Sequence, residues 1–129
     1  MEGFIITFSA IVTAIILLFI ALFQMLLSLG YPLGEFALGG KYKVLPKKHR
    51  ITSAVNAFIL LFMGYSVLLH ANIFFITEGF PNPVLIWIIT IFLGFHALAN
   101  FVSQSKKEKL VMTPISTIAF LLSLIIALS

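Results

Sequence analysis

Residues 3–34 read GFIITFSAIVTAIILLFIALFQMLLSLGYPLG, a stretch without a single charged side chain. About 20 consecutive apolar residues are enough for a helix to cross the hydrocarbon core of a bilayer. Three further stretches are also free of Asp, Glu, Lys and Arg, namely residues 51–77, 79–105 and 110–129. Each is long enough to span a membrane. The sequence therefore predicts an all-α membrane protein, a bundle of four transmembrane helices.

The composition excludes most soluble classes of protein. The chain of 129 residues is 61% hydrophobic and 9% charged, whereas an average soluble domain is about a quarter charged. So few charges cannot cover the surface of a soluble globule of this size. The apolar stretches are continuous rather than alternating, which argues against a transmembrane β-barrel. Because the chain has no cysteine, a disulfide framework, a thiolate metal site and thiol catalysis are excluded.

Capping and turn residues set the expected helix boundaries. Gly30 and Pro32 are expected to end the first helix, because glycine suits a C-terminal cap and proline disfavours helical geometry before it. Thr52 or Ser53 is expected to cap the second helix, and a Pro-Asn-Pro turn precedes the third. Pro114 is expected in the first turn of the fourth helix, where a missing amide donor costs little. We therefore predict one domain, residues 1–129, with spans at residues 4–29, 52–76, 84–103 and 110–128.

All eight basic residues fall in two of the loops between these spans. They are Lys41, Lys43, Lys47, Lys48 and Arg50 in the first loop, and Lys106, Lys107 and Lys109 in the third. Loops rich in Lys and Arg stay on the cytoplasmic side of a membrane. We therefore expect a multi-pass protein of the cell membrane, with its basic loops in the cytoplasm and both termini outside. The same rule accounts for the net charge of +4, so no nucleic-acid partner is expected.

Polar side chains inside a membrane are costly and often functional, so they are the candidates for a site. From the helical rise, Gln24, Asn56, His96 and Asn100 fall at a similar depth near the cytoplasmic end. His96 and Asn100 are four residues apart and so share one helix face. The alternative is structural, because amides and hydroxyls commonly bridge membrane helices. His70 lies alone near the outer face, where an interfacial histidine is the simpler interpretation.

The segment from Gly30 to Lys41 is apolar but too rich in Gly and Pro for a regular span, and it contains Glu35. Irregular backbone at membrane depth is tolerated where it is buried in protein or lines a wet cavity. Glu35 is expected to pair with Lys41 or Arg50 or to hydrogen-bond His96, with an exposed carboxylate as the alternative. We predict a polar pocket open to the cytoplasm, whose mouth attracts an anionic headgroup. The candidate ligand-binding residues are Glu35, Asn56, His96, Asn100, Gln24, Tyr31, Lys41 and Arg50.

No catalytic residue, metal site or cofactor is assigned. The three histidines do not form a metal-binding pair such as His-x-x-x-His. The charged run at residues 103–109 is expected to be a solvated loop that sets the topology. For packing, at least two of the small residues Ala10, Ala14, Gly64 and Gly94 are expected at helix contacts, because small side chains let backbones approach closely in a membrane.

One resemblance covers most of the chain. It is carried by residues 34–42 and 44–46 (GEFALGGKY and VLP), together with Asn100, Ser103, Ser105, Glu108 and Pro114. This pattern resembles a group of small bacterial four-helix integral membrane proteins. The resemblance implies a bacterial origin and a location in the cytoplasmic membrane, and it implies no particular activity.

Three classes of function remain open from the sequence. The favoured one is a membrane protein that binds a lipid or a small hydrophobic ligand through a cytoplasm-facing polar pocket. The second is a small oligomeric transporter or channel, because four short helices enclose little space. The third is a membrane enzyme acting on a lipid, with Glu35 or His96 as the general acid–base. The expected partners are membrane lipids, together with a second copy of the chain or another membrane protein.

Overall fold

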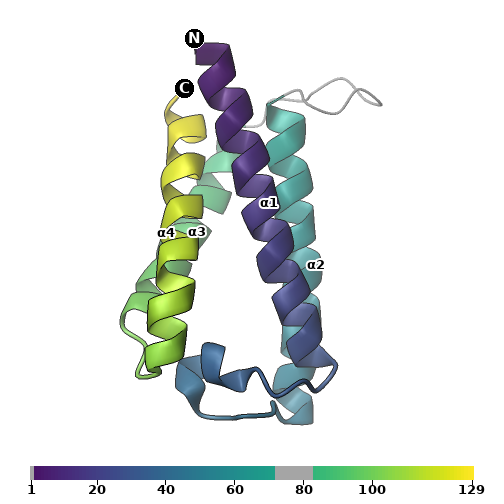
Figure 1. The fold of residues 1–129 in the computed structure, drawn as a ribbon. Helices are drawn as coiled ribbons and strands as arrows, with labels where there is room; N and C mark the ends of the chain where they lie inside the picture. The colour runs from purple at the N-terminus through teal and green to yellow at the C-terminus, as the bar shows by residue number, and fades with distance from the viewer. Residues whose placement is uncertain (1, 72–82) are drawn as a thin grey trace.

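The computed structural model describes residues 2–71 and 83–129, and this part of the chain is helical, with four long α-helices (Figure 1). They are α1 (Glu2–Ser28), α2 (Lys47–His70), α3 (Pro83–Phe101) and α4 (Lys106–Leu128). Two short 3-10 helices, η1 (Gly34–Phe36) and η2 (Leu38–Gly40), connect α1 to α2. Each of the four long helices is long and apolar enough to cross a membrane. The prediction of four helices, each long and apolar enough to span a membrane, is confirmed.

Helices that are neighbours in sequence form the main pairs. α1 packs chiefly on α2 and α3 chiefly on α4, while α1 also contacts α4 and α2 touches α3 only slightly. The two pairs lie close together at the end that carries the chain termini and stand apart at the other end, where η1 and η2 lie across the bundle (Figure 1). The core between them contains Leu17, Leu60, Ile89, Leu93 and Ala119.

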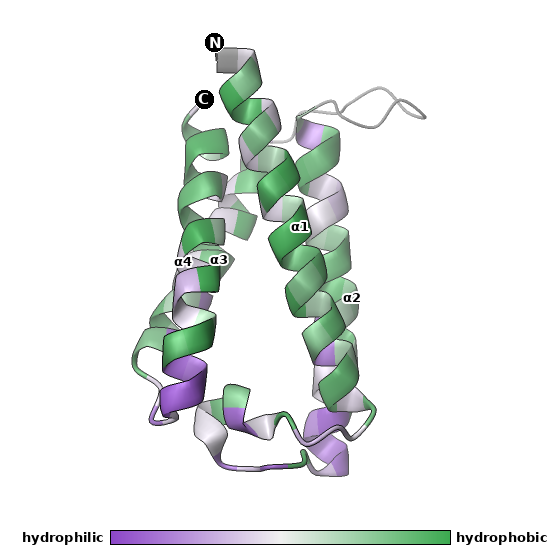
Figure 2. Cartoon of the chain, in the orientation of Figure 1, coloured by the Kyte–Doolittle hydropathy of each residue, from purple (hydrophilic) through white to green (hydrophobic). Residues whose placement is uncertain are grey.

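Many large apolar side chains lie on the outside of the bundle, and most of the buried polar side chains carry small hydroxyl groups. Phe8, Phe58, Ile88 and Phe95 are each more than half exposed, and Figure 2 shows hydrophobic residues along all four helices. The buried polar residues are mostly serine and threonine, namely Ser9, Thr13, Ser53, Ser66, Thr90, Ser116 and Ser123, together with Asn100 and Glu108. A soluble bundle has the opposite arrangement. Small polar residues at helix contacts and apolar ones outside are typical of helices surrounded by lipid.

The end of α1 follows the sequence prediction. Gly30 has a φ of +93°, the left-handed conformation that glycine adopts without strain. The Gly30 N–H donates to the carbonyl of Leu27 (3.1 Å), and the Tyr31 N–H donates to the carbonyl of Leu26 (3.2 Å). These two bonds form a Schellman cap, which satisfies carbonyls that the helix end would leave free.

The predicted starts of the second and fourth helices were wrong, because both helices begin earlier. α2 begins at Lys47, after Pro46 in extended geometry, and Thr52 and Ser53 lie inside it and cap nothing. α4 begins at Lys106 after Ser105. Apolar stretches mark only the part of a helix that matches the bilayer, and a helix can continue beyond it into polar surroundings. The predicted end of the second helix and the Asn82 of the Pro-Asn-Pro turn lie outside the described residues.

Pro114 lies in the interior of α4 rather than in its first turn, as a consequence of this earlier start. Proline has no N–H, so the carbonyl of Leu110 lacks its usual donor four residues further along the helix. The third helix ends at Phe101, slightly before the predicted boundary.

The prediction about small residues is confirmed. A Cβ added to Gly64 of α2 would lie 3.8 Å from the carbonyl oxygen of Ala14 in α1, which is ordinary van der Waals contact. A Cβ added to Gly94 of α3 would lie 3.0 Å from the ring of Phe120 in α4. Ala10 is fully buried. The small residues therefore let the members of each helix pair approach closely.

Candidate ligand-binding cavity

A cavity of about 380 Å³ lies between the two helix pairs, at the end of the bundle opposite the termini. It is lined by residues from all four helices and by the segment that connects α1 to α2. The lining consists of Ile20, Phe23, Gln24, Phe36, Ala37, Leu38, Leu45, His49, Thr52, Ser53, Asn56, Phe92, Phe95, His96, Ala99, Asn100, Glu108 and Met112. Aromatic rings and polar groups are mixed in this wall, as is usual for a site that binds a small molecule.

Helical spacing explains why α2 presents polar groups to the cavity. Its lining residues, His49, Thr52, Ser53 and Asn56, follow the spacing that places side chains on one face of a helix. The sequence analysis missed His49, because the helix was expected to start after it. If the second helix had been predicted to start at Lys47, the spacing of these four residues would have placed His49 on the same polar face.

The connecting segment supplies the wall at the end of the cavity. Phe36 of η1 packs edge-on against Phe23 of α1, with their ring centres 6.4 Å apart. Gly34, which begins η1, is buried against the backbone of Tyr42, and its N–H donates to the carbonyl of Lys43 (2.9 Å). Only glycine fits at this close approach of two backbone segments, and it places the aromatic ring of Phe36 under the bundle.

The structure brings together four of the candidate residues. Gln24, Asn56, His96 and Asn100 all line the cavity, at the shared depth expected from the helical rise. Asn100 has a structural partner, because its Nδ2 donates to the hydroxyl of Ser116 in α4 (2.6 Å). Within the described part of the chain, the side chains of Gln24, Asn56 and His96 make no hydrogen bond to another residue. Their polar groups are left to interact with whatever occupies the cavity.

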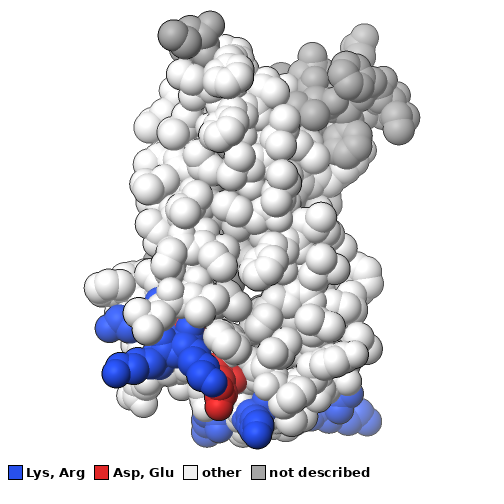
Figure 3. All heavy atoms as spheres, viewed as in Figure 1, with Lys and Arg blue, Asp and Glu red and all other residues white. Residues whose placement is uncertain are grey.

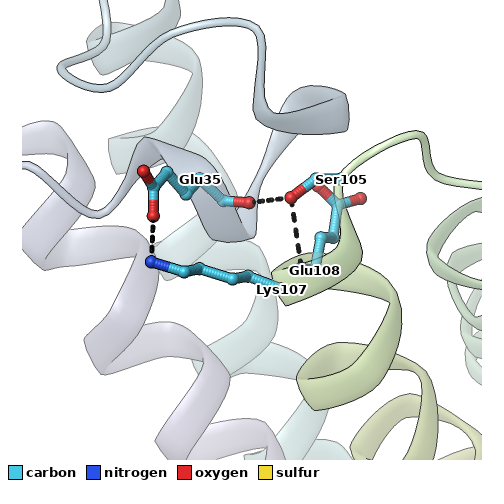
Figure 4. Close-up of polar contacts among 4 residues, drawn as sticks. All are labelled: Glu35, Ser105, Lys107 and Glu108. Carbon is cyan, nitrogen blue, oxygen red and sulfur yellow. Dashed lines mark hydrogen bonds and ion pairs between the residues drawn. The ribbon is translucent and has the colours of Figure 1, made fainter.

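Glu35 does not join this group, and its expected partners were wrong. Its carboxylate forms an ion pair with Lys107 at the start of α4, and it does not line the cavity (Figure 4). The hydrogen bond and the positive charge of Lys107 lower the pKa of the Glu35 carboxyl below its ordinary value. Both side chains are about half exposed, so solvent weakens the pair and its contribution to stability is small.

The other three candidates also lie off the cavity wall. Arg50 donates from Nε to the carbonyl of Ser28 (2.9 Å) and so satisfies a free carbonyl at the end of α1. The Lys41 ammonium lies 5.5 Å from the ring centre of Tyr42. Tyr31 is about half exposed. The side chains of Arg50 and Lys41 thus contact the end of α1 or the connecting segment, and Tyr31 is partly exposed.

The acid in the cavity wall is Glu108, which the sequence analysis had placed in a solvated loop. It lies in the first turn of α4 and is only 6% exposed. One carboxylate oxygen accepts from the N–H of Gly39 in η2 (3.1 Å). The Ser105-x-x-Glu108 spacing matches a capping box, and this signal could have located the helix start.

Ser105 and Lys107 fasten the connecting segment to α4 (Figure 4). The hydroxyl of Ser105 donates to the carbonyl of Glu35 and accepts weakly from the N–H of Glu108 (3.4 Å). The Glu108 carboxylate does not return to close the capping box but crosses to Gly39. Three contacts thus hold η1 and η2 against α4, and the fastening closes one side of the cavity.

Comparisons of the chain with protein-family models, with curated proteins and with solved structures find no match. In residues 2–71 and 83–129, no three His, Cys, Asp or Glu side chains are grouped so that they could hold a metal ion. The fold and the cavity define the class of protein, a four-helix chain suited to cross a membrane several times, with a cavity of mixed polarity at its basic end.

Proposed function

We propose that the protein binds a lipid or another molecule with a large apolar part in this cavity, in the cytoplasmic membrane of a bacterium. The observation that carries the proposal is the wall itself, in which Gln24, Asn56 and His96 stand among phenylalanines without hydrogen bonds to other described residues. Small-molecule sites are typically apolar cavities of about 300–1,000 Å³ with a few polar groups that orient the ligand. The cavity meets both conditions.

We further propose that the cavity end faces the cytoplasm. Lys and Arg gather at one end of the molecule, while the body above them has no charged side chain on the face shown (Figure 3). The connecting segment that bounds the cavity lies at this same end (Figure 1). A bundle inserted according to the positive-inside rule has its basic end in the cytoplasm and both termini outside.

Reporter fusions test this orientation. Green fluorescent protein fused after Gly40 or Ser105 is expected to fluoresce, because it folds in the cytoplasm. Alkaline phosphatase fused after Ser129 is expected to be active, because it folds outside. A fusion after Gly79, which lies outside the described residues, is expected to be external as well. A fluorescent C-terminal fusion with inactive phosphatase at the same position would contradict the proposed orientation.

Filling the cavity tests the binding function. Ala99 and its neighbour Leu98 are both exposed, but Ala99 lines the cavity and Leu98 does not. With dodecanol as the probe, native mass spectrometry of the protein in dodecylmaltoside is expected to show one alcohol retained by the natural chain. Ala99→Trp is expected to weaken retention at least about tenfold, because the indole occupies the space of the alkyl chain.

Leu98→Trp is the matched control, since it adds a similar side chain to the outer face of the same helix turn. It is expected to retain dodecanol as the natural chain does. Melting temperatures and helix content of the two variants show whether both are folded. Equal retention by the natural chain and by folded Ala99→Trp would exclude this cavity as the binding site.

A further inference from the structure

The cavity contains a buried acid without a basic partner. Glu108 is 6% exposed and accepts one hydrogen bond from the Gly39 N–H. Among the residues that the structure describes, the only ion pair is between Lys107 and Glu35. The other neighbouring lysine, Lys109, has its ammonium 5.3 Å from the ring centre of Phe101. The basic residues on both sides of Glu108 are therefore engaged elsewhere.

A buried carboxylate is costly to ionise unless a cation or several hydrogen-bond donors compensate its charge. The Gly39 N–H and the nearby hydroxyl of Ser103 compensate this charge in part. A cation bound in the cavity, whose wall includes Glu108, would supply the remaining compensation. This requirement favours a ligand with a positive group.

The rest of the wall favours the same charge. It contains no Lys or Arg, and it contains the four aromatic rings of Phe23, Phe36, Phe92 and Phe95. The faces of aromatic rings attract cations, and cages of such rings recognise organic ammonium groups. An anionic headgroup would instead meet the charge of Glu108 without a Lys or Arg in the wall, whose basic side chains are the imidazoles of His49 and His96. The expected attraction of an anionic headgroup to Tyr31, Lys41 and Arg50 therefore does not extend into the cavity.

We infer that the cavity binds an amphipathic amine, with its ammonium group beside Glu108 and its apolar part against the phenylalanines. This inference rests on the proposed binding function of the cavity and adds the charge of the ligand. The ammonium can belong to the headgroup of a membrane lipid or to a free amphipathic amine. Both sources share the same chemistry in the cavity.

Three probes with the same alkyl chain separate the charge from the apolar part. They are dodecyltrimethylammonium, neutral dodecanol and anionic dodecanoate, each titrated into the protein in dodecylmaltoside and followed by native mass spectrometry. The natural chain is expected to bind the ammonium about tenfold more tightly than the alcohol. The ammonium can form a partly desolvated charge pair with Glu108, whereas the alcohol cannot. Dodecanoate is expected to bind most weakly.

Glu108→Gln removes the charge and keeps an oxygen that can accept from the Gly39 N–H. It is expected to lower the affinity for the ammonium about tenfold, to that for dodecanol, and to leave dodecanol binding unchanged. Glu2→Gln is the control, because it makes the same change in a carboxylate at the start of α1, at the end of the bundle opposite the cavity. It is expected to leave the binding of all three probes unchanged.

The outcomes distinguish the inference from the proposed function. If dodecanol binds but the ammonium gains nothing, or if Glu108→Gln keeps the preference, the ammonium inference is wrong and the binding function stands. If none of the probes binds, both are wrong. Displacement of the ammonium probe by added phosphatidylethanolamine, but not by phosphatidylglycerol, supports the inference with a lipid headgroup as source. Displacement by neither lipid supports it with a free amine, and stronger displacement by phosphatidylglycerol contradicts it.

Discussion

Gly34→Ala is expected to destabilise the protein strongly, although it adds a single methyl group. A Cβ at this position would overlap the carbonyl oxygen of Tyr42 and lie 2.8 Å from that of Lys43. Both obstacles are backbone atoms, and the Gly34 N–H already donates to the Lys43 carbonyl. The backbone at Gly34 and the backbone at residues 42–43 therefore cannot move apart easily. We expect a loss of about 3 kcal/mol in the free energy of unfolding, at the upper end for an overpacked site.

Gly39→Ala provides the control, in the same connecting segment. A Cβ at Gly39 meets nothing within 4 Å, but its φ of +70° is unfavourable for alanine. The expected loss is about 1 kcal/mol, the usual cost of the left-handed conformation. Unfolding in mixed micelles of dodecylmaltoside and increasing sodium dodecyl sulfate, followed by circular dichroism, measures both variants. Similar losses at the two glycines would contradict the close backbone approach described at Gly34.

Leu17→Ala is expected to have the second large effect. Leu17 of α1 is fully buried among the helices, whereas Leu18, the next residue, is 48% exposed on the outer face. In a bilayer, lipid tails are as apolar as leucine, so a leucine in contact with lipid gains little from burial in the protein. What Leu17→Ala loses is packing, and the cavity left behind is expected to cost about 2 kcal/mol or more.

Leu18→Ala makes the same chemical change one residue away. Lipid can fill the space of the missing atoms, so the expected loss is below about 0.5 kcal/mol. The same unfolding measurement in mixed micelles compares the two. A larger loss from Leu18→Ala than from Leu17→Ala would mean that α1 presents a different face to the bundle.

The sequence was sufficient to locate the four helices but not to place all of their ends. Long apolar stretches identified the spans, and Gly30 identified the cap of α1, because both signals are local. The starts at Lys47 and Lys106 were missed, since charged residues precede the apolar stretch and nothing apolar marks the extra turn. In α4, Ser105 does mark it through its cap position.

The candidate site was predictable to the extent that it depends on depth. The helical rise is constant, so the level of Gln24, Asn56 and His96 in the bundle could be calculated from their positions. The partners of Glu35 and Glu108 could not be predicted from the sequence, because these contacts depend on the path of the backbone through η1 and η2. Glu35 and Lys107 are separated by 72 residues in sequence, and no local pattern predicts which carboxylate turns inward.

The pairing of sequence neighbours has a consequence for biosynthesis. During translation, α1 and α2 can form their hairpin before α3 leaves the ribosome, because their contacts are local in sequence. At that stage the Gly39 N–H lacks its partner Glu108 and the Glu35 carbonyl lacks its partner Ser105, because both partners are synthesised later. The connecting segment is therefore fastened only when the second hairpin docks. Because the cavity wall includes residues of all four helices, we expect the cavity to form only after the second hairpin docks, so that a nascent chain with its first hairpin alone lacks the proposed binding site.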